Sequence, residues 1–157
     1  MSSSNGRKDA TPAPDPTDRD LYASWTKDIL RYRDTDRQGH VNNAVFATFL
    51  ESGRVAIFYD PEQSLAPEGA SFVIARLALD FRAELHWPGD IQIGTSVTRI
   101  GTSSMTLAQG LFAKDTCVAT AETVLVLMDD ITRKSRPLTD SMRERLSQVG
   151  SRRSSAR

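Results

Sequence analysis

A polar loop just before an apolar stretch holds the side chains best able to do chemistry. Two carboxylates, a histidine and two asparagines fall within ten positions, namely Asp34, Asp36, His40, Asn42 and Asn43. Asn43 begins a predicted helix, and the first backbone N–H groups of a helix have no partner inside it. Together with the helix dipole, these N–H groups can hold a developing oxyanion. A carboxylate beside such donors is the outline of a hydrolytic site for acyl transfer.

Asp36 is the leading candidate for that carboxylate, because it lies shortly before Asn43. Two interpretations of Asp36 stay open: a general base or nucleophile, and an ordinary loop aspartate that makes an Asx turn. His40 is either a site residue or a loop histidine that bonds its neighbours. Asn42 and Asn43 are both good helix caps, and capping alone explains either of them.

Other kinds of site find little support in the sequence. Two histidines and one cysteine predict no zinc site, and His86 is predicted to be a turn residue. Cys117 has no histidine near it in the sequence that could activate a thiol. We find no glycine-rich phosphate loop and no serine nucleophile elbow. Hydrolysis at the polar loop therefore calls for no cofactor and no metal.

A long helix is predicted to position the loop. It runs from about Asn43 to Phe58 and carries apolar residues on nearly every side, which is typical of a helix buried all round. Its polar stripe includes Glu51, which inside a buried helix needs a partner such as Arg54 or a structural hydrogen bond. Gly53 in the middle of the helix predicts close packing at that point.

The rest of the chain reads mostly as strands, because apolar residues alternate with polar ones between turn signals. The predicted order is a strand, the long helix, four strands in antiparallel succession and a short helix. A curved antiparallel sheet of about five strands wrapped around a long central helix is an α+β fold. The predicted strands cover residues 21–33, 71–81, 91–100, 104–113 and 117–128, and the short helix follows Thr139 to Leu146.

Length and composition limit the classes of protein. The 157 residues predict one domain, residues 21–146, between disordered tails at 1–20 and 147–157. A formal net charge of zero argues against a nucleic-acid partner. No apolar run is long enough for a membrane helix, so no membrane partner is predicted. The single cysteine suits a reducing, cytoplasmic location.

The polar loop and helix resemble a known family. The residues that carry the resemblance run from Asp34 through Gly39-His40-Val41-Asn42-Asn43 to Glu51 and Arg54. They are similar to the D-x-D-x-x-G-H-V-N-N…E-x-x-R signature of hotdog-fold acyl-CoA thioesterases, the 4-hydroxybenzoyl-CoA thioesterase-like superfamily. The resemblance covers about residues 25–146 and continues through Phe81, Trp87-Pro88-Gly89-Asp90 and Arg136-Pro137.

This resemblance implies a function and an assembly. It implies hydrolysis of an acyl-CoA to a free acid and CoA, with Asp36 as nucleophile or general base. The backbone N–H of Asn43 would polarise the thioester carbonyl, and His40 would order the loop by hydrogen bonding. It also implies a homodimer, or a dimer of dimers, with active sites between subunits.

The sequence departs from the family pattern at two places and is compatible with two other functions. Phe46 stands where many relatives have tyrosine, and the turn at Gly101-Thr102 lacks basic residues for the CoA nucleotide. The alternatives are hydrolysis of acyl groups on an acyl carrier protein, and a non-catalytic acyl-binding module. The remaining candidates for binding the CoA phosphates are Arg76, Arg82, Arg99, Arg133, Lys134 and Arg136.

Overall fold

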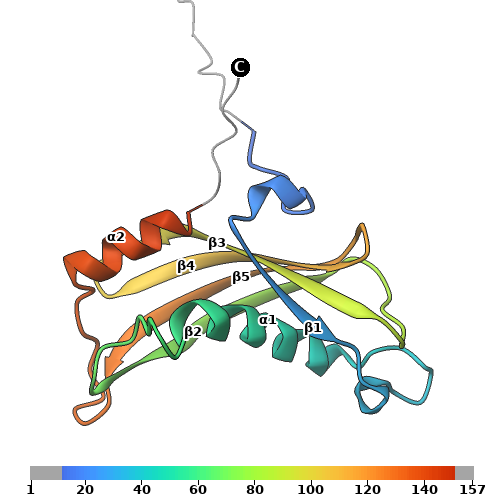
Figure 1. Ribbon diagram of the computed structural model, residues 1–157, viewed down its shortest axis with the longest axis horizontal. Coiled ribbons are helices and arrows are strands. Elements are labelled where there is room, and N and C mark those ends of the chain that lie inside the picture. Colours follow the sequence, from blue (N-terminus) through green and yellow to red (C-terminus); the bar gives the residue numbers. More distant parts are fainter. Residues whose placement is uncertain (1–11, 151–157) are drawn as a thin grey trace, which may run out of the picture.

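Five antiparallel strands form one curved sheet, and a long helix lies along one face of it (Figure 1). The computed structural model describes residues 12–150. The strand order across the sheet is β1-β3-β4-β5-β2, so β1 and β2 are its edges. The strands are β1 (Ser24–Ile29), β2 (Ala70–Phe81), β3 (Asp90–Ile100), β4 (Ser104–Ala113) and β5 (Thr116–Asp129), and the α-helices are α1 (Asn43–Phe58) and α2 (Asp140–Gln148).

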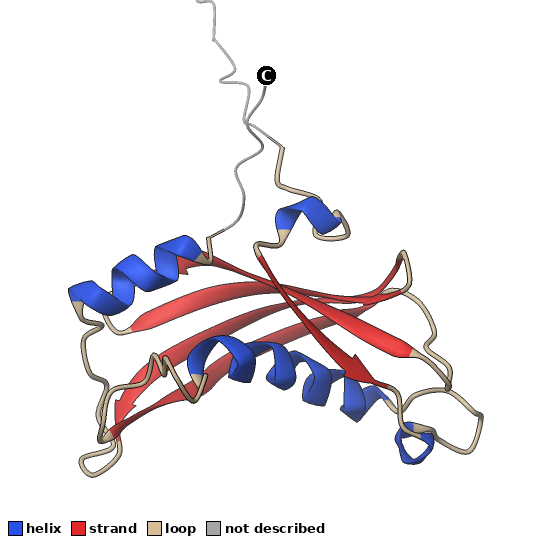
Figure 2. Cartoon of the chain, in the orientation of Figure 1, coloured by secondary structure: helices blue, strands red, loops and turns tan. Residues whose placement is uncertain are grey.

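This arrangement confirms the predicted α+β hotdog fold and the predicted order of its elements (Figure 2). The first strand differs from its prediction over residues 21–33. It covers only Ser24–Ile29, and a short 3₁₀ turn, Tyr32–Asp34, leads into the polar loop. No helix among residues 12–150 is long and apolar enough to cross a membrane.

Apolar side chains of α1 build the core against the sheet. Phe46, Phe49 and Leu50 pack with residues of β3, β4 and β5 beneath the first half of the helix. Phe58 belongs to a second cluster beneath the end of α1, which α2 closes with Leu146. The cap of α2 is as predicted, because the Thr139 side chain accepts a hydrogen bond from the backbone of the first turn.

The prediction that α1 is buried on every side is wrong. The helix packs mainly against β1 and β3, so one of its faces remains open in the single chain. Val55 is 45% exposed, and Glu51 also lies at the surface. Glu51 therefore needs no buried partner.

Arg54 is buried in the helix and bonds to the sheet instead of to Glu51. Its Nη1 donates to Oε1 of Gln109 at 3.2 Å. The Gln109 amide in turn donates to the Leu50 carbonyl at 3.0 Å and to the Thr95 hydroxyl at 3.1 Å. Burial lowers the pKa of the Arg54 guanidinium, and the nearby charge of Glu51 opposes that effect. A polar network thus ties the middle of α1 to β3 and β4.

Residues before the predicted domain start pack against the sheet. Tyr22 is buried, and its hydroxyl donates to the Pro16 carbonyl at 2.6 Å. The Arg19 guanidinium carbon lies 4.3 Å from the ring centre of Trp25 and 4.9 Å from that of Phe112. These are cation–π contacts. The ordered contacts therefore begin before the predicted start at residue 21.

The other end of the chain also continues past its predicted limit at residue 146. The Val97 backbone N–H donates to the Val149 carbonyl at 2.8 Å, and Gly150 forms a parallel bridge with Val97. The outer parts of the two predicted tails, residues 1–11 and 151–157, lie outside the described residues.

Candidate active site

The polar loop folds into a tight turn that presents Asp36. The Asp36 backbone N–H donates to the His40 carbonyl at 2.8 Å, and the Gly39 N–H donates to the Asp36 carbonyl at 3.1 Å. Gly39 has a φ of +82°, in the region that glycine adopts most easily. Thr35 and Val41 form an antiparallel bridge that closes the base of the turn. These local contacts therefore fix the position of the Asp36 backbone, from which its side chain extends.

The two oxygens of the Asp36 carboxylate have different surroundings. Oδ1 accepts hydrogen bonds from the backbone N–H groups of Gln38 at 2.8 Å and His40 at 3.2 Å. This is the Asx turn of the alternative interpretation. Oδ2 has no hydrogen-bond partner among residues 12–150, and the side chain is exposed. One oxygen thus holds the carboxylate in place and leaves the other available.

The start of α1 lies beside this turn. Asn42 caps the helix, because its side-chain oxygen accepts from the Ala44 N–H at 3.0 Å. Asn43 is the first helical residue, so its N–H has no intrahelical acceptor. Of the two asparagines, then, Asn42 is the cap and Asn43 supplies the free backbone donor.

Asp36, His40 and Asn43 line one pocket of about 370 Å³. Its apolar wall includes Phe46, whose ring meets that of Phe81 edge to face at 5.1 Å between centres. The structure thus brings all three predicted site residues together. The remaining lining residues are Gln38, Val41, Ala83, Glu84 and Leu85.

Asp34 is close in sequence but takes no part in this pocket. Its side chain is buried, and Oδ2 accepts from the Arg31 backbone N–H at 2.8 Å. Its carbonyl accepts from the Asn42 N–H at 2.8 Å. Asp34 therefore shapes the loop and the helix start, while Asp36 faces the pocket.

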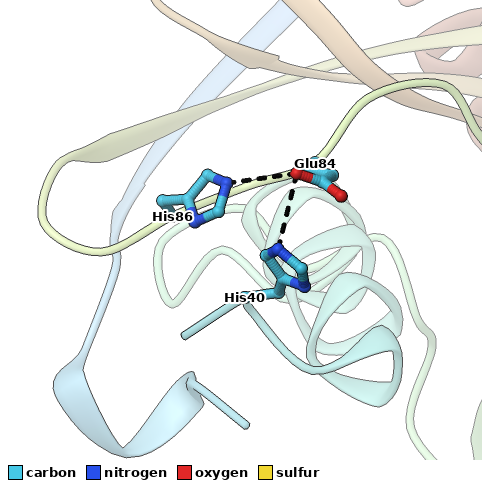
Figure 3. Close-up of side chains that lie close together, drawn as sticks. All are labelled: His40, Glu84 and His86. Atoms are coloured by element: carbon cyan, nitrogen blue, oxygen red, sulfur yellow. Dashed lines mark ion pairs between the residues drawn. The ribbon is translucent and has the colours of Figure 1, made fainter. Parts of the chain in front are cut away.

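Reasoning from sequence missed the segment between β2 and β3 as part of the site. The Val41 N–H donates to the Leu85 carbonyl at 2.7 Å, so this segment runs beside the polar loop. Glu84 and His86 then lie next to His40 (Figure 3). The prediction of His86 as a mere turn residue overlooked this contact. Only the resemblance, which extends from Phe81 to the Trp87 turn, pointed to this part of the chain.

Comparison with known proteins identifies the family. Residues 30–146 match the family described as the thioesterase-like superfamily. The acyl-CoA thioester hydrolase YbgC of Escherichia coli O6:H1 is 27% identical over 115 residues, which are 71% of this chain and 86% of that protein.

Two solved structures show the same fold. A thioesterase from Thermus thermophilus, solved with coenzyme A and zinc, has a TM-score of 0.72 and 26% identity, covering 82% of this chain and 95% of that one. The PA5185 protein of Pseudomonas aeruginosa PAO1 has a TM-score of 0.77 and 21% identity, covering 85% and 96%. With the family match spanning most of the chain, this protein belongs to the thioesterase-like superfamily and is a thioester hydrolase with the hotdog fold.

Proposed function

We propose that this protein hydrolyses acyl-CoA thioesters in the pocket between the polar loop and the start of α1. The observation that carries the proposal is that two residues line the same pocket: Asp36, which has one carboxylate oxygen without a hydrogen bond among residues 12–150, and Asn43, the first residue of α1, whose N–H has no intrahelical acceptor. A base or nucleophile and an oxyanion donor are the two groups that acyl transfer to water requires. The name of the similar YbgC protein supports CoA as the thiol.

The reaction needs Asp36 Oδ2 in one of two roles. As a general base it takes a proton from water, and the oxygen of that water attacks the thioester carbonyl carbon. As a nucleophile it attacks that carbon itself, and water then cleaves the resulting anhydride. In both cases the C–S bond breaks, the sulfur leaves as the CoA thiolate, and the acyl group ends as a free acid.

Asn43 and His40 support this step through their backbones. The Asn43 N–H would bind the carbonyl oxygen as it gains negative charge, aided by the positive end of the α1 dipole. The His40 N–H holds Asp36 Oδ1 at 3.2 Å, and the His40 carbonyl holds the Asp36 N–H at 2.8 Å. His40 is thus a positioning residue for Asp36.

The pocket also offers complementary surfaces for the two halves of the substrate. The rings of Phe46 and Phe81 form an apolar wall for the acyl group. Arg82 follows Phe81 directly, is exposed at the surface, and would supply positive charge for CoA phosphates. Arg76 is less available, because it forms an ion pair with Glu122.

We infer further that two copies of the chain associate through the β2 side of the sheet. β2 is an edge strand, and unpaired edges are normally covered. Its apolar side chains Ile74, Leu77 and Phe81 are 48%, 36% and 51% exposed. They lie opposite buried residues of β5, so they continue the core face of the sheet into solvent. Light scattering tests this, and a fully active monomer would contradict it.

The chemistry is tested with Asp36→Asn. The substitution keeps the size and one hydrogen-bond acceptor for the Gln38 and His40 N–H groups but removes the negative charge. We expect kcat on an acyl-CoA panel, followed by thiol release, to fall by about 10²–10⁴-fold, or further for a nucleophile. Binding of acyl-CoA should persist.

Asp34→Asn is the matched control, since Asp34 lies on the same loop but outside the pocket. It should lower stability more than kcat. Activity within a few-fold of wild type in Asp36→Asn, or a larger loss of kcat in Asp34→Asn, would overturn the assignment. If the wild-type protein cleaves no acyl-CoA, the function would instead be hydrolysis of acyl groups on an acyl carrier protein, or acyl binding without catalysis.

A further inference from the structure

We propose that His40, Glu84 and His86 form a binding site for a divalent transition-metal ion, with zinc as the best match. The two imidazoles and the carboxylate offer donor atoms that all lie within 4.8 Å of one another (Figure 3). Two nitrogen donors and one oxygen donor are a set that zinc accepts readily. Hydrolysis by Asp36 does not require this ion, so binding of the ion can be tested without substrate.

The backbone places these three side chains together before any ion arrives. His40 and His86 are partners in an antiparallel bridge. The adjacent bond from the Val41 N–H to the Leu85 carbonyl at 2.7 Å marks them as a non-hydrogen-bonded pair, in which side chains come closest. Glu84 lies two residues before His86, and alternate residues of an extended chain point to the same side. All three donors therefore share one side of the bridge.

The distances suit an ion better than direct hydrogen bonds. Nε2 of His40 and Nε2 of His86 each lie 3.4 Å from Oε2 of Glu84. Good hydrogen bonds between charged groups are shorter, about 2.7–2.9 Å. Donors bound tetrahedrally to zinc at about 2.0–2.1 Å are separated by about 3.3–3.4 Å. The carboxylate therefore already sits at the spacing that zinc requires from each histidine.

The hydrogen bond made by the other ring nitrogen of His86 also supports a metal site. Its Nδ1 lies 3.3 Å from the carbonyl oxygen of Gly39. A carbonyl only accepts, so the ring form that makes this hydrogen bond has its hydrogen on Nδ1, and in the neutral ring Nε2 is then the atom that can bind a metal. A cation between Nε2 and the Glu84 carboxylate would bind both groups. A ring N–H given to a backbone carbonyl is also the usual support of a metal-binding histidine.

The site would be open on one side. Three protein ligands leave a fourth tetrahedral position free, as in zinc sites that bind a further molecule. His40 and Glu84 line the same pocket as Asp36. Glu84 is 70% exposed, so an ion can reach the donors from solvent.

The test is zinc binding by the untagged protein, stripped with a chelator and followed by calorimetry without substrate. We expect one zinc ion per chain. The chain has two histidines, so both sets of imidazole NMR signals should shift together as zinc is added. His86→Gln and Glu84→Gln should each weaken zinc binding by about tenfold or more, since the loss of an outer-shell partner alone costs 10–100-fold.

Two controls make the result decisive. Glu62→Gln removes an exposed carboxylate elsewhere and should leave zinc affinity unchanged. Cys117→Ser should do the same, because the thiol is not part of the cluster. The proposal is overturned if the wild-type protein binds no zinc up to millimolar concentrations. It is also overturned if either His86→Gln or Glu84→Gln binds zinc like wild type, or if Cys117→Ser abolishes binding.

Discussion

Gly53 of α1 lies so close to Ile93 of β3 that a Cβ atom at Gly53 would stand 2.6 Å from the Ile93 Cγ2 atom. The amide nitrogen of Gln109 and the hydroxyl of Thr95 would be 3.0 Å and 3.2 Å away. Side chains from both neighbouring strands thus fill the space that a larger residue would need. The close packing predicted from a glycine in mid-helix is confirmed.

We therefore expect Gly53→Ala to lower the free energy of unfolding by about 1–3 kcal/mol, the usual cost of overpacking. This is opposite to the gain of about 1 kcal/mol that alanine brings to an unconstrained helix position. Urea unfolding measures the change. Thr48→Ala is the control, because Thr48 is exposed on the same helix and should be neutral or slightly stabilising. Equal behaviour of the two variants would show that the helix can move away from the sheet.

A chain shortened to residues 21–146 should be less stable than one spanning 12–150. It lacks the Arg19 contact with Trp25, and it lacks the Val149 carbonyl that accepts from the Val97 N–H at 2.8 Å. Each contact is worth about 0.5–1.5 kcal/mol, so we expect a combined loss above about 1 kcal/mol by thermal or urea unfolding. The 12–150 chain should match the full chain. Equal stability of both shortened chains would mean that these end contacts contribute nothing.

The Cys117 thiol should react slowly in the folded protein. Burial raises its pKa, and the charge of Arg82 opposes that rise only in part. A raised pKa means less thiolate at a given pH, so the folded thiol stays protonated where an unfolded one has begun to ionise. Thiolate formation should therefore become progressively destabilising as pH rises above the ordinary thiol pKa of about 8.5.

Alkylation by iodoacetamide, followed by mass spectrometry, checks this expectation. At about pH 8, where a free thiol is partly ionised, the folded protein should react more slowly than the same chain in guanidinium. The rate should keep increasing at pH values where that of a cysteine peptide has levelled off. A folded rate equal to the unfolded one would contradict it.

Much of the fold could be predicted because local patterns determine it. Asn42 caps α1 where the sequence places a polar residue before an apolar run, so the predicted and observed helix both cover residues 43–58. The strands followed from alternation and from turn residues. Tyr22 escaped prediction because its burial depends on Gly94 and Gly110 of distant strands. Side chains at those positions would collide with its ring.

The site was predictable only in part, for the same reason. Asp36, His40 and Asn43 are neighbours in sequence, so a motif could bring them together. Glu84 and His86 reach His40 through strand pairing, and no spacing in the sequence reveals that bridge. The open face of α1 was not predicted either. Its apolar residues suggest that other elements cover the helix on every side, and the isolated chain does not supply that cover.

The two tryptophans divide the molecule into separately observable parts. Trp25 lies under the Arg19 side chain, and Trp87 directly follows His86 and stands edge to face with Tyr32 at 5.4 Å between ring centres. Because the chain has no third tryptophan, replacing one by phenylalanine leaves a single tryptophan as a selectively excitable fluorophore. Its emission would then report either docking of the N-terminal segment or events beside the histidine cluster, with no added label.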